Sequence, residues 1–304
     1  MKEYLFNYYD KFSCIAGKCK HTCCRGWEIL IDKKTLKKYK KKKDDYSLNL
    51  KSGIDFKNKR FKFSEDKRCA FLNSENLCDL IINYDKDHLC QVCRDHPRFR
   101  SFFNGRIETG LGLSCEEACR IILGSKEKIT LILNVDKKER LSKFDKQVLE
   151  FRDKVLLIVQ DRSMPFLDRL GLLLNEYKIG DLLSVLNDYK SLLLGFEVLD
   201  ESWKKSLDEA IFDANIIIKD EIVLEQLLSY FIFRHVSKSS SEQDLNLKLI
   251  FSLISTIIIL SLSNSLNSSI FDTARSYSAE IEYSDDNLTR AYDFIERYRR
   301  LGKI

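Results

Sequence analysis

Cysteine is the residue type in this chain that points most directly to chemistry. The chain has ten cysteines in 304 residues, and none follows Cys119. In chain order they are Cys14, Cys19, Cys23, Cys24, Cys69, Cys78, Cys90, Cys93, Cys115 and Cys119. Thiolates bind soft and borderline metals, and four of them satisfy either a tetrahedral zinc ion or a cubane iron–sulfur cluster. This distribution predicts a sulfur-rich metal site in the first part of the chain.

The spacing of the cysteines favours an iron–sulfur cluster and leaves zinc open. Zinc modules usually show paired C-x2–4-C knuckles, whereas Cys23 and Cys24 are adjacent here and Cys90-x2-Cys93 is the lone short pair. A C-x3-C-x2-C radical signature is absent, because Gly26 occupies its third position. Neighbouring side chains of an extended segment point to opposite faces, so Cys23 and Cys24 are not expected to face one metal. Ten thiols also leave room for a second site or for structural cysteines.

The last two cysteines fall in a predicted short helix from Ser114 to Gly124. Ser114 and Glu117 have the spacing of a capping box, and Gly124 is suited to close the helix. Cys115 then lies in the first turn, where the helix dipole favours a thiolate. Cys119 lies one turn later among apolar neighbours and is expected to be a small buried residue rather than a ligand.

The four histidines offer alternative ligands. His21 lies inside the first cysteine cluster, and His88 and His96 flank Cys90-x2-Cys93. Each of these three could replace a cysteine at a metal or lie at the surface. His235 follows an apolar helical segment and is interpreted as a helix residue.

Short strands and turns are predicted around the cysteines. The apolar run from Gly26 to Ile31 predicts a strand, and Asp32 predicts the N-cap of a lysine-rich helix. A turn at Asn73–Asn76 is expected to join two short strands. Asn104-Gly105 predicts a hairpin with a type I′ turn, in which both central residues have positive φ.

From about residue 140 the apolar residues recur at helical spacing. Pro165 suits the first turn of a helix, and further helices are expected over residues 181–194, 222–236, 243–264 and 286–301. The fold class is therefore predicted to be mainly α. An N-terminal cysteine-rich metal-cluster domain with short strands and hairpins, residues 1–130, precedes an all-helical domain, residues 131–304.

Composition indicates a globular protein with uneven charge. Residues 1–120 carry 26 Lys+Arg and 17 Asp+Glu, against 25 and 29 in residues 121–304. The basic half could steer an anionic partner or be a solvated lysine-rich face. The first residues show no signal peptide, and the apolar run from Leu249 to Leu262 is too short to span a membrane. We therefore expect a cytoplasmic protein without membrane association, where clustered cysteines indicate metal or catalysis rather than disulfides.

The cysteine pattern resembles that of a known family. The resemblance is carried by Phe12-Ser13-Cys14, Cys19-x3-Cys23-Cys24-Arg25-Gly26-Trp27, Cys69-x-Phe71-Leu72, Leu77-Cys78-x-Leu80, Cys93-x3-Pro97-Arg98 and Leu113-Ser114-Cys115. Looser similarity continues through Leu224–Arg234 and Tyr277–Leu288, with Tyr283 where the pattern has histidine. On these residues the chain resembles the flagellin lysine-N-methylases (FliB), which are related to the YkgJ-like cysteine-cluster proteins.

The resemblance implies an enzyme with a 4Fe–4S cluster. Such an enzyme transfers the methyl group of S-adenosylmethionine to the ε-amine of surface lysines on flagellin. The family pattern uses Cys14, Cys19, Cys23, Cys24, Cys69, Cys78, Cys93 and Cys115, which become the candidate metal ligands; Cys90 and Cys119 lie outside it. Which four bind the cluster stays open. Neither nucleic acid nor membrane is an expected partner, because the basic half lacks a recognised motif, and the sequence does not indicate an oligomeric state.

The chain lacks the Gly-rich turn by which many enzymes bind S-adenosylmethionine. Gly110-Leu111-Gly112 is too short a signal, so the cluster is the expected anchor, with Arg98 as a candidate partner for a carboxylate. No catalytic residue is assigned. Glu108, Asp95 and Tyr84 are candidates to accept the proton of the attacking lysine, whose ordinary pKa is about 10.4. The alternative is a YkgJ-like zinc- or iron-binding interaction module that does not methylate.

Overall fold

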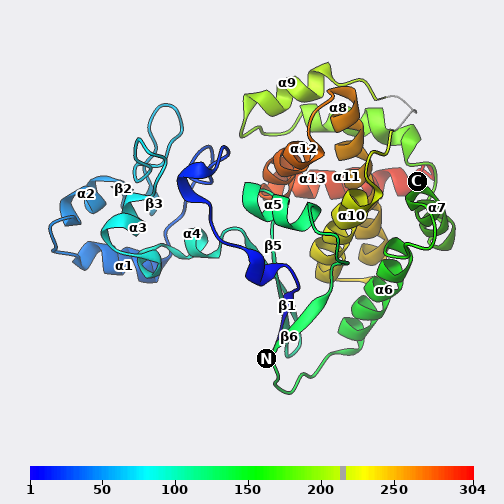
Figure 1. Cartoon of the computed structure of the whole chain (residues 1–304), viewed down its shortest axis with the longest axis horizontal. Helices are drawn as coiled ribbons and strands as arrows, with labels where there is room; N and C mark the ends of the chain where they lie inside the picture. Colours follow the sequence, from blue (N-terminus) through cyan, green and yellow to red (C-terminus); the bar gives the residue numbers. More distant parts are fainter. Residues whose placement is uncertain (213–216) are drawn as a thin grey trace. The chain divides into compact units, whose positions relative to one another are not determined.

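The computed structural model describes residues 1–212 and 217–304. The chain divides into two compact units. The smaller unit comprises Ser13–Arg98 and Cys115–Glu117; the larger unit comprises Met1–Phe12, Phe99–Ser114 and Ala118–Ile304. The described part of the chain contains thirteen α-helices and six short strands, so the mainly α prediction is confirmed (Figure 1). The predicted domain boundary near residue 130 stays a prediction.

A four-stranded sheet in the larger unit joins segments distant in the sequence. Its strands are β1 (Lys2–Phe6), β4 (Arg98–Phe103), β5 (Arg106–Leu111) and β6 (Leu131–Val135), in the order β4-β5-β1-β6. The first strand pairs in parallel with β5, with Leu5 opposite Thr109, and antiparallel with β6. Neither β1 nor β6 was predicted.

The hairpin predicted at Asn104-Gly105 is confirmed, because the two residues connect β4 to β5. Only Gly105 has a positive φ, of 80°, and Asn104 does not. The expected type I′ turn is therefore wrong, since that turn needs positive φ at both central residues.

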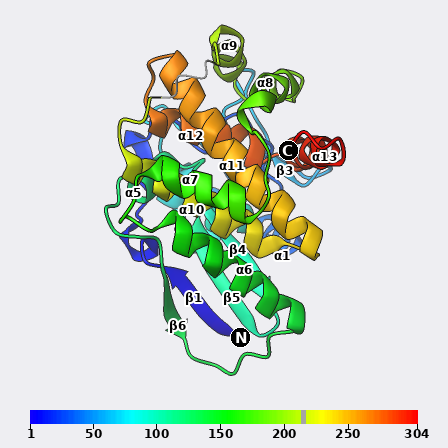
Figure 2. The same ribbon diagram turned by 90° about the vertical axis from the view of Figure 1, so that its right-hand side faces the viewer.

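Two helices buried on nearly all sides form the centre of the larger unit (Figure 2). These are α10 (Glu221–His235) and α11 (Glu242–Ser265), which pack against each other. A helix that is apolar all round is expected inside a large core. By length and composition α11 is the one described helix that could cross a membrane, yet it is mostly buried within the protein. The prediction of a buried helix over Leu249–Leu262 is thus confirmed.

The remaining helices of the larger unit pack around this pair. The predicted ones are α6 (Lys143–Val159), α7 (Phe166–Glu176), α8 (Leu186–Leu194) and α13 (Asp285–Arg300). A Ser142–Asp145 capping box begins α6, and Pro165 is the N-cap of α7. Two helices were not predicted, α9 (Glu201–Glu209) and α12 (Ile270–Tyr277), and a π-helical turn over Ser278–Glu282 follows the second.

The smaller unit has short helices and few paired strands. Its elements are α1 (Lys33–Lys41), α2 (Ser47–Ser52), α3 (Asp79–Asn83), α4 (Gln91–Asp95), β2 (Ile54–Asp55) and β3 (Arg60–Phe61). The predicted N-cap is confirmed, because the Asp32 carboxylate accepts a hydrogen bond from the Thr35 amide at 2.9 Å. Its other oxygen accepts from the Gln91 amide, so one side chain joins the starts of α1 and α4.

The strands predicted beside the cysteines are wrong. Residues 26–31 contain a single bridge instead, between Leu30 and Arg60, and Gly26 turns the chain with a φ of 92°. The turn at Asn73–Asn76 is present, and the Asn73 side chain accepts hydrogen bonds from the Glu75 and Leu77 amides. Only one bridge, Leu72 to Cys78, flanks it, since α3 begins immediately afterwards.

The helix predicted after Ser114 is α5 (Glu116–Leu123). Its expected capping box is wrong, because the Ser114 hydroxyl is buried without a hydrogen-bond partner in the described structure. Cys115 immediately precedes the helix. The Gly124 amide donates to the Arg120 carbonyl at 3.0 Å as the helix ends.

Candidate metal centre

Backbone hydrogen bonds hold the segment around Cys23 and Cys24 to a second stretch of the smaller unit. The Gly26 amide donates to the Lys67 carbonyl at 3.0 Å, and the Cys69 amide donates to the Cys24 carbonyl at 2.8 Å. Cysteines 45 positions apart in sequence are thereby fixed next to each other. The backbone at Cys23-Cys24 turns, so the extended segment expected there is wrong.

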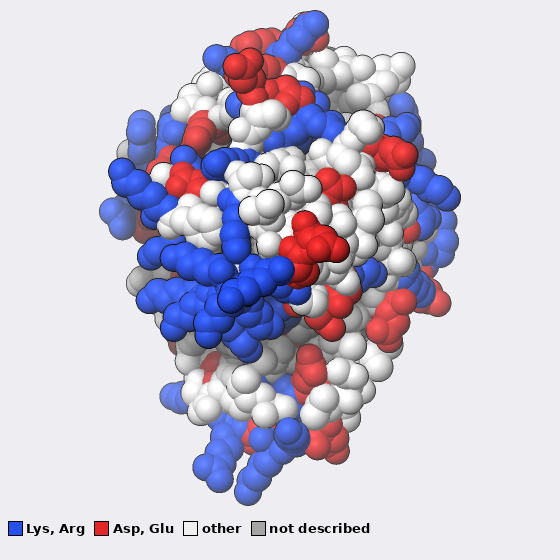
Figure 3. Space-filling model, turned by 90° about the vertical axis from the view of Figure 1, so that its left-hand side faces the viewer, with Lys and Arg blue, Asp and Glu red and all other residues white. Residues whose placement is uncertain are grey.

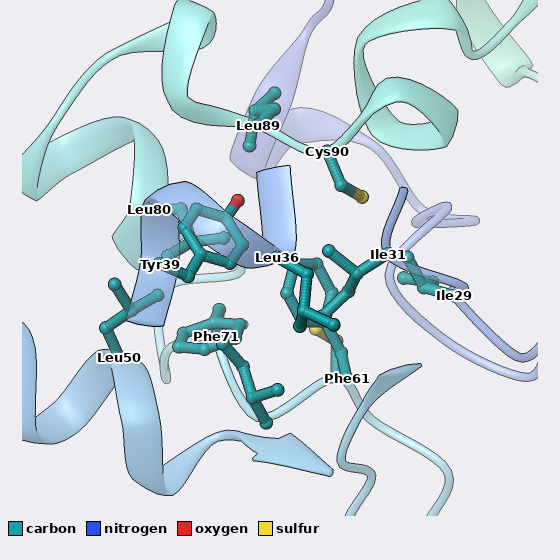
Figure 4. Packing of buried hydrophobic residues seen from close by; sticks show 12 residues of the cluster. Ile29, Ile31, Leu36, Tyr39, Leu50, Phe61, Phe71, Leu80, Leu89 and Cys90 are labelled. Atoms are coloured by element: carbon teal, nitrogen blue, oxygen red, sulfur yellow. The ribbon is translucent and has the colours of Figure 1, made fainter. Parts of the chain in front are cut away.

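Five thiols pack around the apolar core of the smaller unit. We call them the inner cysteine group: Cys24, Cys69, Cys78, Cys90 and Cys93. Cys69 and Cys90 are buried among residues such as Tyr39 and Phe71, and the other three are partly buried against them. Figure 4 shows Cys90 with the packed apolar side chains. One member, Cys90, lies outside the family pattern.

Four further cysteines are exposed or half-buried, and we call them the outer cysteine group: Cys14, Cys19, Cys23 and Cys115. Glu116 connects two segments of this group. Its Oε2 accepts hydrogen bonds from the Lys20 amide at 2.8 Å and the His21 amide at 3.1 Å, and the Cys19 thiol lies 3.6 Å away. Glu116 was not predicted as a site residue. Its only signal in the sequence is its position directly after Cys115.

In two cysteine pairs a thiol–thiol hydrogen bond gives the two sulfurs different pKa values. The bond between Cys23 and Cys24 raises the pKa of Cys23 and lowers the pKa of Cys24 to about 7. The bond between Cys90 and Cys93 likewise lowers the pKa of Cys90 and raises the pKa of Cys93. In each pair the sulfur with the lowered pKa, Cys24 or Cys90, becomes the thiolate more readily than its partner.

Burial and neighbouring acidic groups act on other thiols. Burial raises the pKa of Cys19 to about 12, and the nearby Glu116 carboxylate adds to the effect. Burial also raises the pKa of Cys69 to about 12 and the pKa of Cys78. Metal binding at these sulfurs must displace their protons, so affinity should rise with pH.

The cysteines fit a metal group in donor type and number. All ten are free thiols, and nine of them lie in the smaller unit. Within residues 1–212 and 217–304, however, no three His, Cys, Asp or Glu side chains converge as ligands of one metal ion. The eight candidate ligands are thus gathered in one unit as free thiols, and their role as ligands stays a prediction.

Cys119 belongs to the larger unit and to neither cysteine group. It is buried, and its sulfur lies 3.3 Å from the Phe271 carbonyl oxygen. This agrees with the interpretation of Cys119 as a small core residue.

The histidines have distinct surroundings. His88 contacts the Asp85 carboxylate through Nδ1 at 2.7 Å, and the His96 ring lies 6.0 Å from the Trp27 ring. His235 belongs to α10, as predicted, and its ring is buried in the larger unit.

The remaining sequence candidates are spread over the chain. Glu108 is buried in the larger unit, where it pairs with Arg106 and with Arg152, so its carboxylate has a structural role. Tyr84 donates a hydrogen bond to the Asp44 carboxylate at 2.7 Å. Arg98 donates to the Arg94 carbonyl at 3.3 Å, and a carboxylate-binding role for Arg98 stays a prediction, as does proton transfer by Asp95.

A buried polar network in the larger unit was not predicted. Glu282, at the end of the π-helical turn, contacts the Arg234 Nε at 2.9 Å and the His235 Nε2 at 2.6 Å. Tyr230 donates to the same carboxylate at 2.9 Å and accepts from the Leu113 amide at 3.2 Å. Burial by itself raises the pKa of the Glu282 carboxyl. The nearby groups, of which the Arg234 guanidinium has the largest effect, outweigh burial and lower this pKa to about 2. The sequence signal was present, since Arg234 and Glu282 fall in the two later blocks of family resemblance.

Comparisons with known proteins confirm the resemblance to the lysine-N-methylase (FliB) family. The chain is 28% identical over 129 residues to the protein named Lysine-N-methylase from Salmonella typhimurium, which covers 40% of this chain and 32% of that one. A lysine-N-methylase from Salmonella choleraesuis matches at 28% over 128 residues with the same coverage. The flagellar biosynthetic protein FliU of Salmonella muenchen also matches at 28% over 128 residues, covering 40% of this chain and 76% of FliU.

The match covers only part of the larger relatives. This chain spans about a third (32%) of the length of each of the two lysine-N-methylases. No family model matches the chain, and no solved structure matches it.

Proposed function

We propose that this protein is a protein-lysine N-methyltransferase that uses S-adenosylmethionine, acts on flagellin and carries a 4Fe–4S cluster. The observation that carries the proposal is the similarity to proteins named lysine-N-methylase, together with nine free thiols in one compact unit. The flagellar name of the third relative supports flagellin as the substrate.

The outer cysteine group is our candidate for the cluster ligands. It supplies the three thiols that would hold a 4Fe–4S cluster with one iron left open, and its members are exposed or half-buried, as a cofactor that meets a small-molecule substrate requires. Three thiolates would leave the fourth iron of the cluster with an open position, which would supply a chelating site for the amino and carboxylate groups of S-adenosylmethionine. Glu116 would position Cys19 through its hydrogen bonds to the Lys20 and His21 amides.

The inner cysteine group would then serve the core of the smaller unit. Its sulfurs pack against apolar side chains and are less accessible than those of the outer group. Burial raises the pKa of Cys69 and of Cys78, so these two thiols stay protonated and behave as small apolar residues there. Substitutions in the two groups should therefore have different effects.

The test begins with anaerobic purification and analysis of iron, acid-labile sulfide and zinc. We expect iron and sulfide in equal amounts with a brown chromophore. Cys19→Ser should lose both, whereas the matched Cys119→Ser in the larger unit should retain them. The outer group would be excluded as ligands if iron and sulfide were retained in all four of its serine variants, Cys14→Ser, Cys19→Ser, Cys23→Ser and Cys115→Ser.

The activity is tested by incubating the loaded protein with flagellin and S-adenosylmethionine. Mass spectrometry should show flagellin lysines gaining one methyl mass or several. Unmodified flagellin, with a methylase of the same class active in parallel, would contradict the enzyme assignment.

A zinc- or iron-binding interaction module is the second candidate, favoured by the partial coverage of the lysine-N-methylases. Zinc without sulfide, together with unmodified flagellin, would support this candidate.

A further inference from the structure

Helix α1 presents a polar face made of lysine alone. Its inward side chains, Thr35, Leu36 and Tyr39, are buried in the core of the smaller unit. The exposed residues of α1, together with the exposed Lys43 just beyond its end, are all lysines. They are Lys33, Lys34, Lys37, Lys38, Lys40, Lys41 and Lys43. We call these seven residues the α1 lysine face. Figure 3 shows Lys and Arg side chains gathered on one side of the molecule.

These lysines have no acidic partners in the described structure. Lys42, which is not part of the face, pairs with Asp44 at 3.3 Å. In the described residues none of the seven lysines of the face lies within ion-pair distance of a carboxylate. The face therefore carries an excess of positive charge without direct ion pairs. Uncompensated charge of one sign raises the local concentration of ligands of the opposite sign.

Helix stability does not account for the lysines at the start of α1. Lys33 and Lys37 are four residues apart, as are Lys34 and Lys38, and like charges at this spacing destabilise a helix by about 0.2–0.5 kcal/mol per pair. Lys33 and Lys34 also stand in the first turn, where the helix dipole disfavours positive charge. Lys38, Lys40 and Lys41 stand in the last turn, where the dipole favours positive charge, so helix stability accounts for the C-terminal lysines but not for Lys33 and Lys34.

The composition of the face selects the class of partner. It contains no arginine, so it lacks the forked donors typical of nucleic-acid sites. Tyr39 is buried, and the half-buried Phe56 ring lies under Lys40, whose Nζ is 5.4 Å from the ring centroid, so the face offers no open stacking surface. Its apolar residue Leu36 is buried as well, so α1 offers no apolar side to insert into a membrane. An acidic polypeptide needs only the complementary charge that this face supplies.

We propose that the α1 lysine face docks an acidic stretch of the protein substrate. This inference deepens the proposed function and rests on it. A target lysine is itself a cation, and a basic enzyme surface repels it. Acidic residues close to the target lysine in the substrate reverse that repulsion. The face would therefore select lysines in acidic surroundings from the many on a protein surface.

Binding of two synthetic peptides to the full chain tests the proposal. One has a central lysine flanked by Asp and Glu, and the other has Asn and Gln at the same positions. Fluorescence anisotropy in the absence of S-adenosylmethionine should show binding of the acidic peptide alone. The binding should weaken as salt is added, because exposed charges are screened.

A triple variant, Lys34→Glu, Lys37→Glu and Lys41→Glu, should weaken binding of the acidic peptide by about tenfold or more, given the usual worth of three exposed charge contacts. The matched control is Lys137→Glu, Lys138→Glu and Lys204→Glu, which makes the same charge change at exposed lysines of the larger unit. Circular dichroism checks that both variants fold. The triple glutamine variant at 34, 37 and 41 replaces the glutamate variant if that one does not fold.

Equal loss in both triple variants would show a net-charge effect and overturn the proposal. Tighter binding of an RNA duplex or of phosphatidylserine vesicles than of the acidic peptide would overturn the class of partner. Because binding is measured without methyl transfer, an acidic peptide that binds but is not methylated contradicts only the proposed function.

Discussion

The two units of this protein are stabilised in different ways. In the larger unit α10 and α11 are buried on nearly all sides, and buried ion pairs such as Arg152–Glu108 and Arg169–Glu225 join distant segments. The smaller unit has short helices, single bridges and one modest apolar core surrounded by thiols. Small domains bury a smaller fraction of their surface and often need a disulfide or a metal for stability. A metal held by the thiols would add stability to the smaller unit, and this stays a prediction.

Removing the Glu282 carboxylate should have the largest effect on the larger unit. Glu282→Ala leaves Arg234 buried without its ion-pair partner, which costs about 3–5 kcal/mol of unfolding free energy. Hydrogen exchange in α10 should report this loss. Glu296→Ala removes a carboxylate paired with Arg299 and Arg300 on a more accessible surface and should change stability by less than about 0.5 kcal/mol. Similar losses in the two variants would contradict the buried network.

A matched pair of leucines on α2 tests the core of the smaller unit. Leu50 is fully buried, whereas Leu48 is 79% exposed. Leu50→Ala should destabilise the smaller unit by about 2–4 kcal/mol, through lost burial and the cavity that remains. Leu48→Ala should be nearly neutral. Hydrogen exchange is expected to increase in α1 of the Leu50 variant and to stay unchanged in α11; an equal increase in α11 would show that the two units unfold together.

Acid should destabilise the larger unit through His235. Burial lowers the pKa of His235 to about 4 from its ordinary value of 6.5. Above pH 6.5 the imidazole is neutral in both the folded and unfolded states, and stability is complete. As pH falls from 6.5 to 4, only the unfolded chain takes up the proton, so the unfolding free energy falls by up to about 3 kcal/mol.

Denaturant unfolding across this pH range, followed by the hydrogen exchange of α10, measures the effect. His235→Gln, which cannot titrate, should show a smaller decline than the unmodified protein. An identical decline in both would assign the acid sensitivity to other groups.

Local patterns were sufficient to predict most helices. The periodic apolar residues of α6, α10 and α11 identified them, and Asp32 marked the start of α1 through its side-chain cap. Interactions between distant segments were not predictable in this way. The strands β1 and β6 were missed because their pairing joins the two ends of a long stretch of chain, and a strand of five residues has little pattern of its own.

The candidate site shows the same limit. The spacing of the cysteines predicted which part of the chain is rich in thiols, and the family resemblance indicated eight of them. Neither the spacing nor the resemblance could predict the division into inner and outer cysteine groups. That division depends on the hydrogen bond between Cys69 and Cys24 and on the position of Glu116. Cys90 shows this most clearly: it lies outside the family pattern and inside the inner group.

The parallel pairing of β1 with β5 has a consequence for synthesis on the ribosome. The strand β1 is made about a hundred residues before its partner β5, which emerges after nearly all of the smaller unit. If the smaller unit folds as it emerges, the flexible loop that must close between the two strands shortens to the few residues on either side of that unit. By the logarithmic dependence on loop length, this lowers the entropic cost of closure by about 2 kcal/mol. Early folding of the thiol-rich unit would therefore assist the assembly of the helical unit around its sheet.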